Sequence, residues 1–167
     1  MTRIRTAAAS LAVFAALLST TVEARGVIRA TGPNGASTAA AGPRGAAVRA
    51  RGTVRNSDGS VTHASGGAFA GYNGSRGARA SSTTVSPDGS VSRQGEAGAS
   101  GPRGSVYSQG GFTRSSDGTW SGSRSSSATN AQTGNSYSGT TQIDPATGKP
   151  VHTGTCSDAY GNTIPCR

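Results

Sequence analysis

One short motif recurs in this sequence as Asp58-Gly59-Ser60-Val61, Asp88-Gly89-Ser90-Val91 and Asp117-Gly118-Thr119-Trp120. The aspartates are 30 and 29 residues apart, and a looser copy that begins at Asp144 follows 27 residues later. Asp and Gly tolerate the positive φ of hairpin turns, and β-forming residues flank each copy. We therefore predict that the chain folds as successive β-hairpins with these structural turn residues: Asp58, Gly59, Asp88, Gly89, Asp117 and Gly118.

A second series of turn signals lies midway between the first, at residues 72–74, 101–104, 132–135 and 160–162. Clusters of Gly and Ser lie between the two series, at residues 65–67, 109–111 and 125–127. If every cluster interrupts a strand, the strands are about five or six residues long. Each would carry one large apolar residue in an alternating pattern. No 3.6-residue apolar stripe follows residue 24, which argues against helices.

The composition limits the size of any hydrophobic core. From Arg25 onward, Leu, Ile, Val and Phe account for 13 of 143 residues. A branched-apolar fraction this low is typical of disordered chains, and it excludes an enzyme with a thick core. The predicted fold class is accordingly all-β or largely disordered. The ordered form would be a β-solenoid, a meander or a stacked sheet of strand-turn repeats, either in the monomer or only on assembly; the alternative is a flexible Gly/Ser-rich coil.

The N-terminus has the three regions of a secretory signal peptide. Arg3 and Arg5 precede an uncharged run of twelve residues, 7–18, and small residues lie at the cleavage positions before Arg25. An uncleaved membrane anchor is the alternative, but twelve helical residues rise only about 18 Å, against a hydrocarbon core of about 30 Å. We expect cleavage after Ala24, no transmembrane span in the mature chain, and a secreted, periplasmic or cell-surface location in a bacterium.

Four segments follow from these patterns. Residues 1–24 are the signal peptide, and residues 25–51 are expected to form a flexible basic linker because they are rich in Ala, Gly and Pro and contain no acid. Residues 52–155 form the Ser/Gly-rich β-repeat region. Residues 156–167 are expected to form a hairpin closed by a disulfide.

The two cysteines, Cys156 and Cys166, flank a Gly-Asn turn signal. Thiols tend to pair in an oxidising compartment, so we predict that these two form one disulfide. The histidines, His63 and His152, have no cysteine or carboxylate at zinc-site spacing. The sequence also shows no nucleophile elbow and no phosphate-binding loop. We expect no enzymatic activity, no metal and no cofactor.

The basic excess is the remaining functional signal. The mature chain has 14 basic and 6 acidic residues, and basic residues are densest between Arg44 and Arg55. Such a surface attracts anionic polymers such as extracellular DNA, acidic polysaccharide or lipopolysaccharide. The predicted contacts are Arg44, Arg49, Arg51 and Arg55. Aromatic residues such as Tyr107 and Trp120 would either stack on bases or sugars or belong to a core.

The signal peptide, the Ser/Gly-rich strand-turn repeats and the aromatic alternation over residues 52–155 resemble bacterial extracellular fibre subunits of the curli type. Gln residues in this chain, Gln94, Gln109, Gln132 and Gln142, are unequally spaced, unlike the fixed ladder positions of those families. The resemblance implies self-association into a structural or extracellular matrix component. A binding module for anionic polymers is the alternative function.

Overall fold

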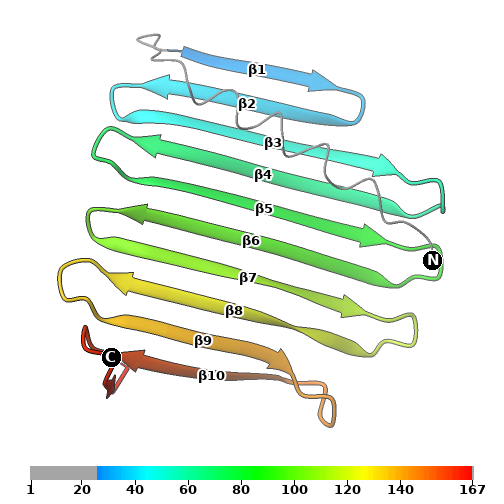
Figure 1. Ribbon diagram of the computed structural model, residues 1–167. Coiled ribbons are helices and arrows are strands. Elements are labelled where there is room, and N and C mark those ends of the chain that lie inside the picture. Colours follow the sequence, from blue (N-terminus) through cyan, green and yellow to red (C-terminus); the bar gives the residue numbers. More distant parts are fainter. Residues whose placement is uncertain (1–25, 167) are drawn as a thin grey trace, which may run out of the picture.

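A computed structural model describes residues 26–166 of the chain. These residues form one antiparallel sheet of eleven strands, in which the strands lie side by side in sequence order (Figure 1). The strands are β1 (Gly26–Gly32), β2 (Gly35–Gly42), β3 (Gly45–Arg55), β4 (Val61–Gly71), β5 (Arg76–Val85), β6 (Val91–Gly101), β7 (Gly104–Arg114), β8 (Trp120–Asn130), β9 (Ser136–Ile143), β10 (Pro150–Ser157) and β11 (Thr163–Ile164).

The predicted all-β fold of strand-turn repeats is confirmed, and its form is the meander. The predicted signal peptide, residues 1–24, lies outside the described residues. The segment 25–51 differs from expectation, because residues 26–51 belong to β1, β2 and β3 instead of a linker. Its Gly-Pro-x-Gly sequences are tight hairpin connections, with turns at residues 33–34 and 43–44.

The strands are longer than predicted. β3, β4, β6, β7 and β8 each have 11 residues, because the Gly and Ser clusters lie inside strands and do not end them. Glycine is needed there for close approach of neighbouring backbones. A Cβ at Gly67, for example, would lie 2.7 Å from the carbonyl oxygen of Val48.

The sheet is one layer without a hydrophobic core. No hydrophobic residue among residues 26–166 is buried, and Val54 and Trp120 are 58% and 53% exposed. Figure 1 shows no second layer of helices or strands against either face of the sheet. The aromatic residues are therefore not core residues in the usual sense.

Aromatic side chains instead cover glycines on neighbouring strands. A Cβ placed on Gly98 would lie 3.2 Å from Cδ2 of Tyr107, and one on Gly154 would lie 2.8 Å from Cε2 of Tyr137. Such cross-strand pairs shield backbone that glycine leaves open to water, and they stabilise a sheet locally. The pairs are Phe69 with Gly77, Tyr107 with Gly98, Phe112 with Gly122, and Tyr137 with Gly154.

The Asp-Gly turns have the predicted role. At the β5–β6 connection, the Ser86 N–H donates to the Ser90 carbonyl at 2.9 Å, and the Gly89 N–H donates to the Ser86 carbonyl at 3.0 Å. The Asp88 carboxylate accepts hydrogen bonds from the Ser90 N–H at 2.9 Å and the Ser90 hydroxyl at 2.7 Å. Gly89 has φ of 82°. The turns at Asp58 and Asp117 repeat this arrangement, and Asn73 supplies the acceptor in a fourth copy.

All four predicted Asp turns lie on the same edge of the sheet. Asp58, Asp88, Asp117 and Asp144 connect β3–β4, β5–β6, β7–β8 and β9–β10, the turns on the right of Figure 1. The 27- to 30-residue period of the motif is therefore the length of one hairpin, two strands with their two turns.

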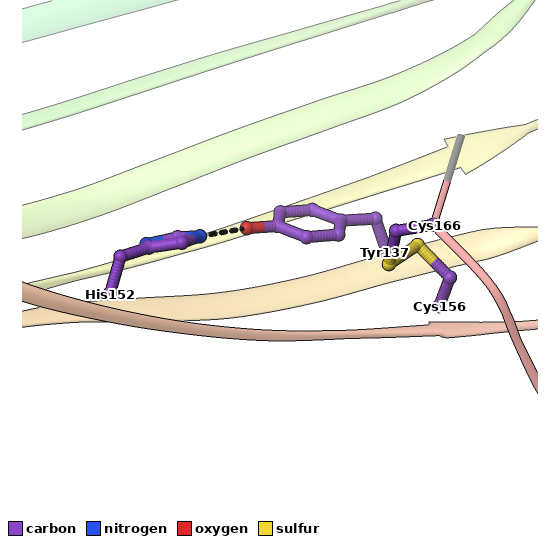
Figure 2. The surroundings of a disulfide bond; sticks show 4 residues. All are labelled: Tyr137, His152, Cys156 and Cys166. Atoms are coloured by element: carbon purple, nitrogen blue, oxygen red, sulfur yellow. Dashed lines mark hydrogen bonds between the residues drawn. A yellow bond between two sulfur atoms is a disulfide. The ribbon is translucent and has the colours of Figure 1, made fainter.

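The C-terminal hairpin is closed by a disulfide between Cys156 and Cys166, whose Cα atoms are 5.3 Å apart. β11 pairs with the end of β10, where Cys156 lies opposite Ile164. Figure 2 shows the disulfide at the base of the Tyr137 side chain, whose ring extends toward His152. The bond ties the end of the chain to the last long strand.

The positive φ of the turn glycines gives the first prediction. Replacing Gly89 with Ala should lower stability by about 1–2 kcal/mol, because an L-residue is strained at this φ even though a Cβ there would meet nothing within 4 Å. Gly42→Ala is the matched control, since a Cβ at Gly42 also meets nothing within 4 Å and its φ is not positive. Thermal unfolding followed by circular dichroism measures both; equal midpoints for the two variants would contradict the proposed role of the turn.

The turn carboxylates give a pH prediction. The hydrogen bonds from the Ser90 hydroxyl and N–H lower the pKa of Asp88 below its ordinary value of 3.8, and turn hydrogen bonds lower the pKa of Asp58 and Asp117 in the same way. Because the pKa is lower in the folded state, this stabilisation is present above the unfolded pKa and is lost as the pH falls through the folded pKa.

The unfolding temperature should therefore fall as the pH is lowered from about 5 to about 2. A variant with Asp58, Asp88 and Asp117 changed to Asn keeps the acceptor oxygens and should show a smaller fall over this range. Glu96→Gln is the control, because Glu96 lies in the middle of β6 and outside every turn. If the triple variant shows the full pH dependence of the parent, the turn carboxylates do not cause it.

Candidate functional site

The pairing register decides which side chains share a face of the sheet. Directly paired residues lie on the same face, as do residues two apart along a strand. Arg49 pairs with Gly67, and Gly67 pairs with Arg79, so both arginines project from one face. Applied across the sheet, the register places these exposed side chains on that face: Arg29, Arg49, Arg51, Arg55, Arg79, Arg93, Arg114 and Arg124. We call this surface the arginine face.

Carboxylates are segregated from the arginine face. Between residues 26 and 157 of the described chain, the strands place no Asp or Glu on it. Glu96 lies on the opposite face, where the Tyr107 hydroxyl donates to its carboxylate at 3.4 Å. The turn aspartates lie at the edge and accept hydrogen bonds from their own turns. The arginine face is therefore a surface of uncompensated positive charge.

The structure places three of the four predicted polymer contacts together. Arg49, Arg51 and Arg55 lie on the arginine face of β3, whereas Arg44 lies in the β2–β3 turn at the edge of the sheet. Sequence reasoning did not assign a role to the arginines that join them from other strands, such as Arg79 and Arg124. The sequence does contain a signal for these arginines, because the position of a hairpin turn determines which residues of its two strands are paired.

The arginines have few partners within the sheet. The Arg124 Nη1 donates to the Ser108 hydroxyl at 3.0 Å, one strand away on the same face. Arg76, the one strand arginine that the described register places on the opposite face, donates from Nε to the Ser100 hydroxyl at 3.3 Å. Neutral hydroxyls leave the guanidinium charge intact, so these groups keep donors for an external anion.

Tyr137 and His152 form a small polar cluster at the β9–β10 end of the same face. The Tyr137 hydroxyl lies 2.8 Å from His152 Nε2 (Figure 2). The Thr141 hydroxyl lies 2.9 Å from His152 Nδ1. Both imidazole nitrogens are thus engaged with hydroxyl groups. The two rings are nearly parallel, 23° apart, with centroids 6.5 Å from each other. This cluster holds the tyrosine ring in place over the sheet; it offers no activated nucleophile.

A shallow groove runs across the arginine face. Arg49 and Arg79 lie on one side of it, and Phe69 lies on the other, over Gly77. At the β9 end, the Tyr137 ring reaches across to Gly139 and Gly154, which continue the line of Arg49 and Arg79. Between the rings the groove is lined by small or apolar residues of successive strands: Gly77, Ala99, Val106 and Ala128. The groove is therefore cationic on one side at its β3–β5 end, and this side continues over β6 to β8 with Ala97, Ser108 and Ser126.

Two other kinds of functional feature are absent from the residues that the structure describes, a metal site and a membrane-spanning helix. Residues 26–166 contain no group of three His, Cys, Asp or Glu side chains that could hold a metal ion. The described residues also include no helix long and apolar enough to cross a membrane. Comparisons with protein-family models, with curated proteins and with solved structures found no match.

Proposed function

We propose that this protein is an exported, non-enzymatic structural component that binds anionic polymers through its arginine face. The observation that carries the proposal is the one-sided charge: eight arginines project from one face, and the described strands add no carboxylate to it. The strand-turn repeats act as a flat scaffold that spaces these cations. The bound partner would be part of an extracellular or cell-surface matrix.

The physics of polyanion binding suits this surface. A cationic surface displaces the counterions condensed on a charged polymer, which gives a salt-dependent, sequence-independent affinity. The charges of one sign on a face reinforce each other's field, which attracts polyanions over distances comparable with the Debye length. Since the arginines are exposed and extend from a flat sheet, they can contact a polymer along its length.

The C-terminal disulfide supports the exported part of the proposal. Cys156 and Cys166 are joined, and structural disulfides persist mainly in oxidising compartments. The signal-like segment 1–24 gives independent support from the sequence. Together these features favour a periplasmic, secreted or cell-surface bacterial protein.

Polymer binding can be tested with two variants that lose the same number of positive charges, one on the arginine face and one outside it. A variant with Arg49, Arg51, Arg93 and Arg124 changed to Ala should bind duplex DNA weakly at low salt. The slope of log affinity against log salt should also flatten by about 3.6, at about 0.9 per lost phosphate contact. Fluorescence anisotropy over a salt series measures both quantities.

The matched control removes four cations that lie outside the arginine face: Arg44, Arg76, Arg103 and Lys149. It has the same net charge as the first variant, and we expect it to keep most of the parent's affinity and slope. If the two variants lose affinity equally, net charge and not the arginine face is responsible. If neither loses affinity, the proposed function is wrong.

Self-association is a second candidate function, and the outer edge of β1 favours it. In the described sheet, β1 pairs with β2 on one side and with no strand on the other. An open edge presents unpaired backbone N–H and C=O groups, which invite pairing with another chain. Arg29 is the one charge on this strand. Edge-to-edge stacking would extend the sheet into a fibre, as the resemblance to curli-type subunits implies.

A charge placed on the edge strand tests self-association. Ile28→Lys should raise the concentration at which the mature chain associates, since lysine on an edge opposes strand addition. Val54→Lys is the control, because Val54 lies on the same face as Ile28 but on the inner strand β3, and Val54 and Ile28 are both exposed. Sedimentation velocity over a concentration series distinguishes them; a parent that stays monomeric at every concentration contradicts this candidate.

A further inference from the structure

Three arginines of the arginine face lie in one line across the strands. Successive cross-strand partners in this line are Arg29, Thr38, Arg49, Gly67 and Arg79, from β1 to β5. Arginine therefore alternates with a small residue. Neighbouring strands are about 4.8 Å apart, so the arginine Cα atoms recur at about 10 Å along this line.

A second line of residues runs parallel to the first and is apolar. It lies two residues further along each strand, about 7 Å away on the same face. In order of the strands β2 to β9, its members are Ala40, Ala47, Phe69, Gly77, Ala99, Val106, Ala128 and Tyr137. The groove described above follows the second line across the strands from β3 to β9, and Arg49 and Arg79 border it at its β3–β5 end. Arg29 continues the arginine line beyond that end, on β1.

Taking the proposed function as its basis, we propose that this groove binds an acidic polysaccharide with one carboxylate per disaccharide, whose chain runs across the strands. An extended glycan advances per sugar by about the distance between neighbouring strands, about 5 Å. From β1 to β5, a carboxylate on every second sugar then meets Arg29, Arg49 or Arg79 on every second strand. Planar carboxylates also suit the fork of guanidinium donors.

The apolar line fits the other side of such a polymer. A pyranose ring has an apolar C–H face, which packs on aromatic rings as other apolar groups do. Phe69 lies over Gly77, with Cζ 3.0 Å from a Cβ placed there, and Phe69 remains 45% exposed. Its ring thus lies along the sheet and is open to a ligand. Tyr137 lies five strands further along the same line, and its ring reaches over Gly139 and Gly154 and ends the groove there.

Nucleic acid fits the groove less well. Phosphates along one strand of duplex DNA recur every 3.4 Å or so, about three times as often as the arginines in the line. Single-stranded nucleic acid relies on aromatic platforms for successive bases, whereas Gly77, Ala99, Val106 and Ala128 separate the two rings. Binding of DNA should therefore depend on the total charge of the face and not on its arrangement.

Two variants of the full mature chain separate the effect of where the charges lie on polymer affinity from the effect of how many charges there are. The line variant changes Arg29, Arg49 and Arg79 to Ala. The scattered variant changes Arg55, Arg93 and Arg124 to Ala, which removes the same charge from the same face but from three different lines. Hyaluronan, which carries one carboxylate per disaccharide, is the probe, and duplex DNA is the comparison polymer.

We expect the line variant to lose about tenfold more hyaluronan affinity than the scattered variant, and the two variants to lose DNA affinity alike. Polygalacturonate, with a carboxylate on every sugar, should discriminate between the variants less than hyaluronan does. Unchanged circular dichroism spectra show that both variants keep the sheet.

Equal loss of hyaluronan affinity in the two variants would overturn the inferred arrangement. If the parent binds DNA but not hyaluronan, the inferred polysaccharide ligand is wrong, whereas polymer binding by the arginine face still holds. If the parent binds none of the three polymers, the proposed function itself fails.

Discussion

The hydrogen-bond register of the sheet is the constraint on which the remaining features depend. In a one-layer sheet without buried hydrophobic residues among those described, no hydrophobic core selects one register over another. The turns do so: Asp88 and Gly89, with their counterparts in other hairpins, fix which residues face each other. A slip of one residue in a strand would move its side chains to the other face. The one-sided placement of arginine is thus a consequence of the turn geometry.

The sequence predicts the turns well and the strands less well. An Asp-Gly turn is encoded by local chemistry, the positive φ of Gly and the acceptor of Asp, so no distant contact is needed to recognise it. The interior of a strand depends on what lies across from it. Gly66 and Gly67 resemble a break until strands on both sides are known to pair with them, as Arg49 and Arg79 do with Gly67. The Ala-rich segment 26–51 likewise resembles a linker until β4 provides a neighbour for β3.

The arginine face can be predicted from the sequence only where its residues are close together in the chain. Arg49, Arg51 and Arg55 alternate along one strand, so their common face follows from the two-residue period alone. Arg79 joins them through two turns and two registers, and an error of one residue in either turn would have placed it on the other face. The composition therefore indicates a cationic protein, whereas the separation of its charges requires the pairing of every hairpin.

A single-layer sheet leaves apolar groups in water that a folded domain normally buries, and the position of these groups connects folding with function. Phe69, Val106 and Tyr137 share one line of the arginine face, and Phe69 lies beside Arg49 and Arg79, the cations that would attract a polymer. A polymer seated there would cover this apolar line and bring counter-charges to the arginines at once. The unfolded chain carries the same cations but not their one-sided arrangement, so only the difference in binding free energy between the folded and unfolded states would add to the stability of the fold. In this protein, the polymer would provide part of what a second layer or a core provides in other β-proteins.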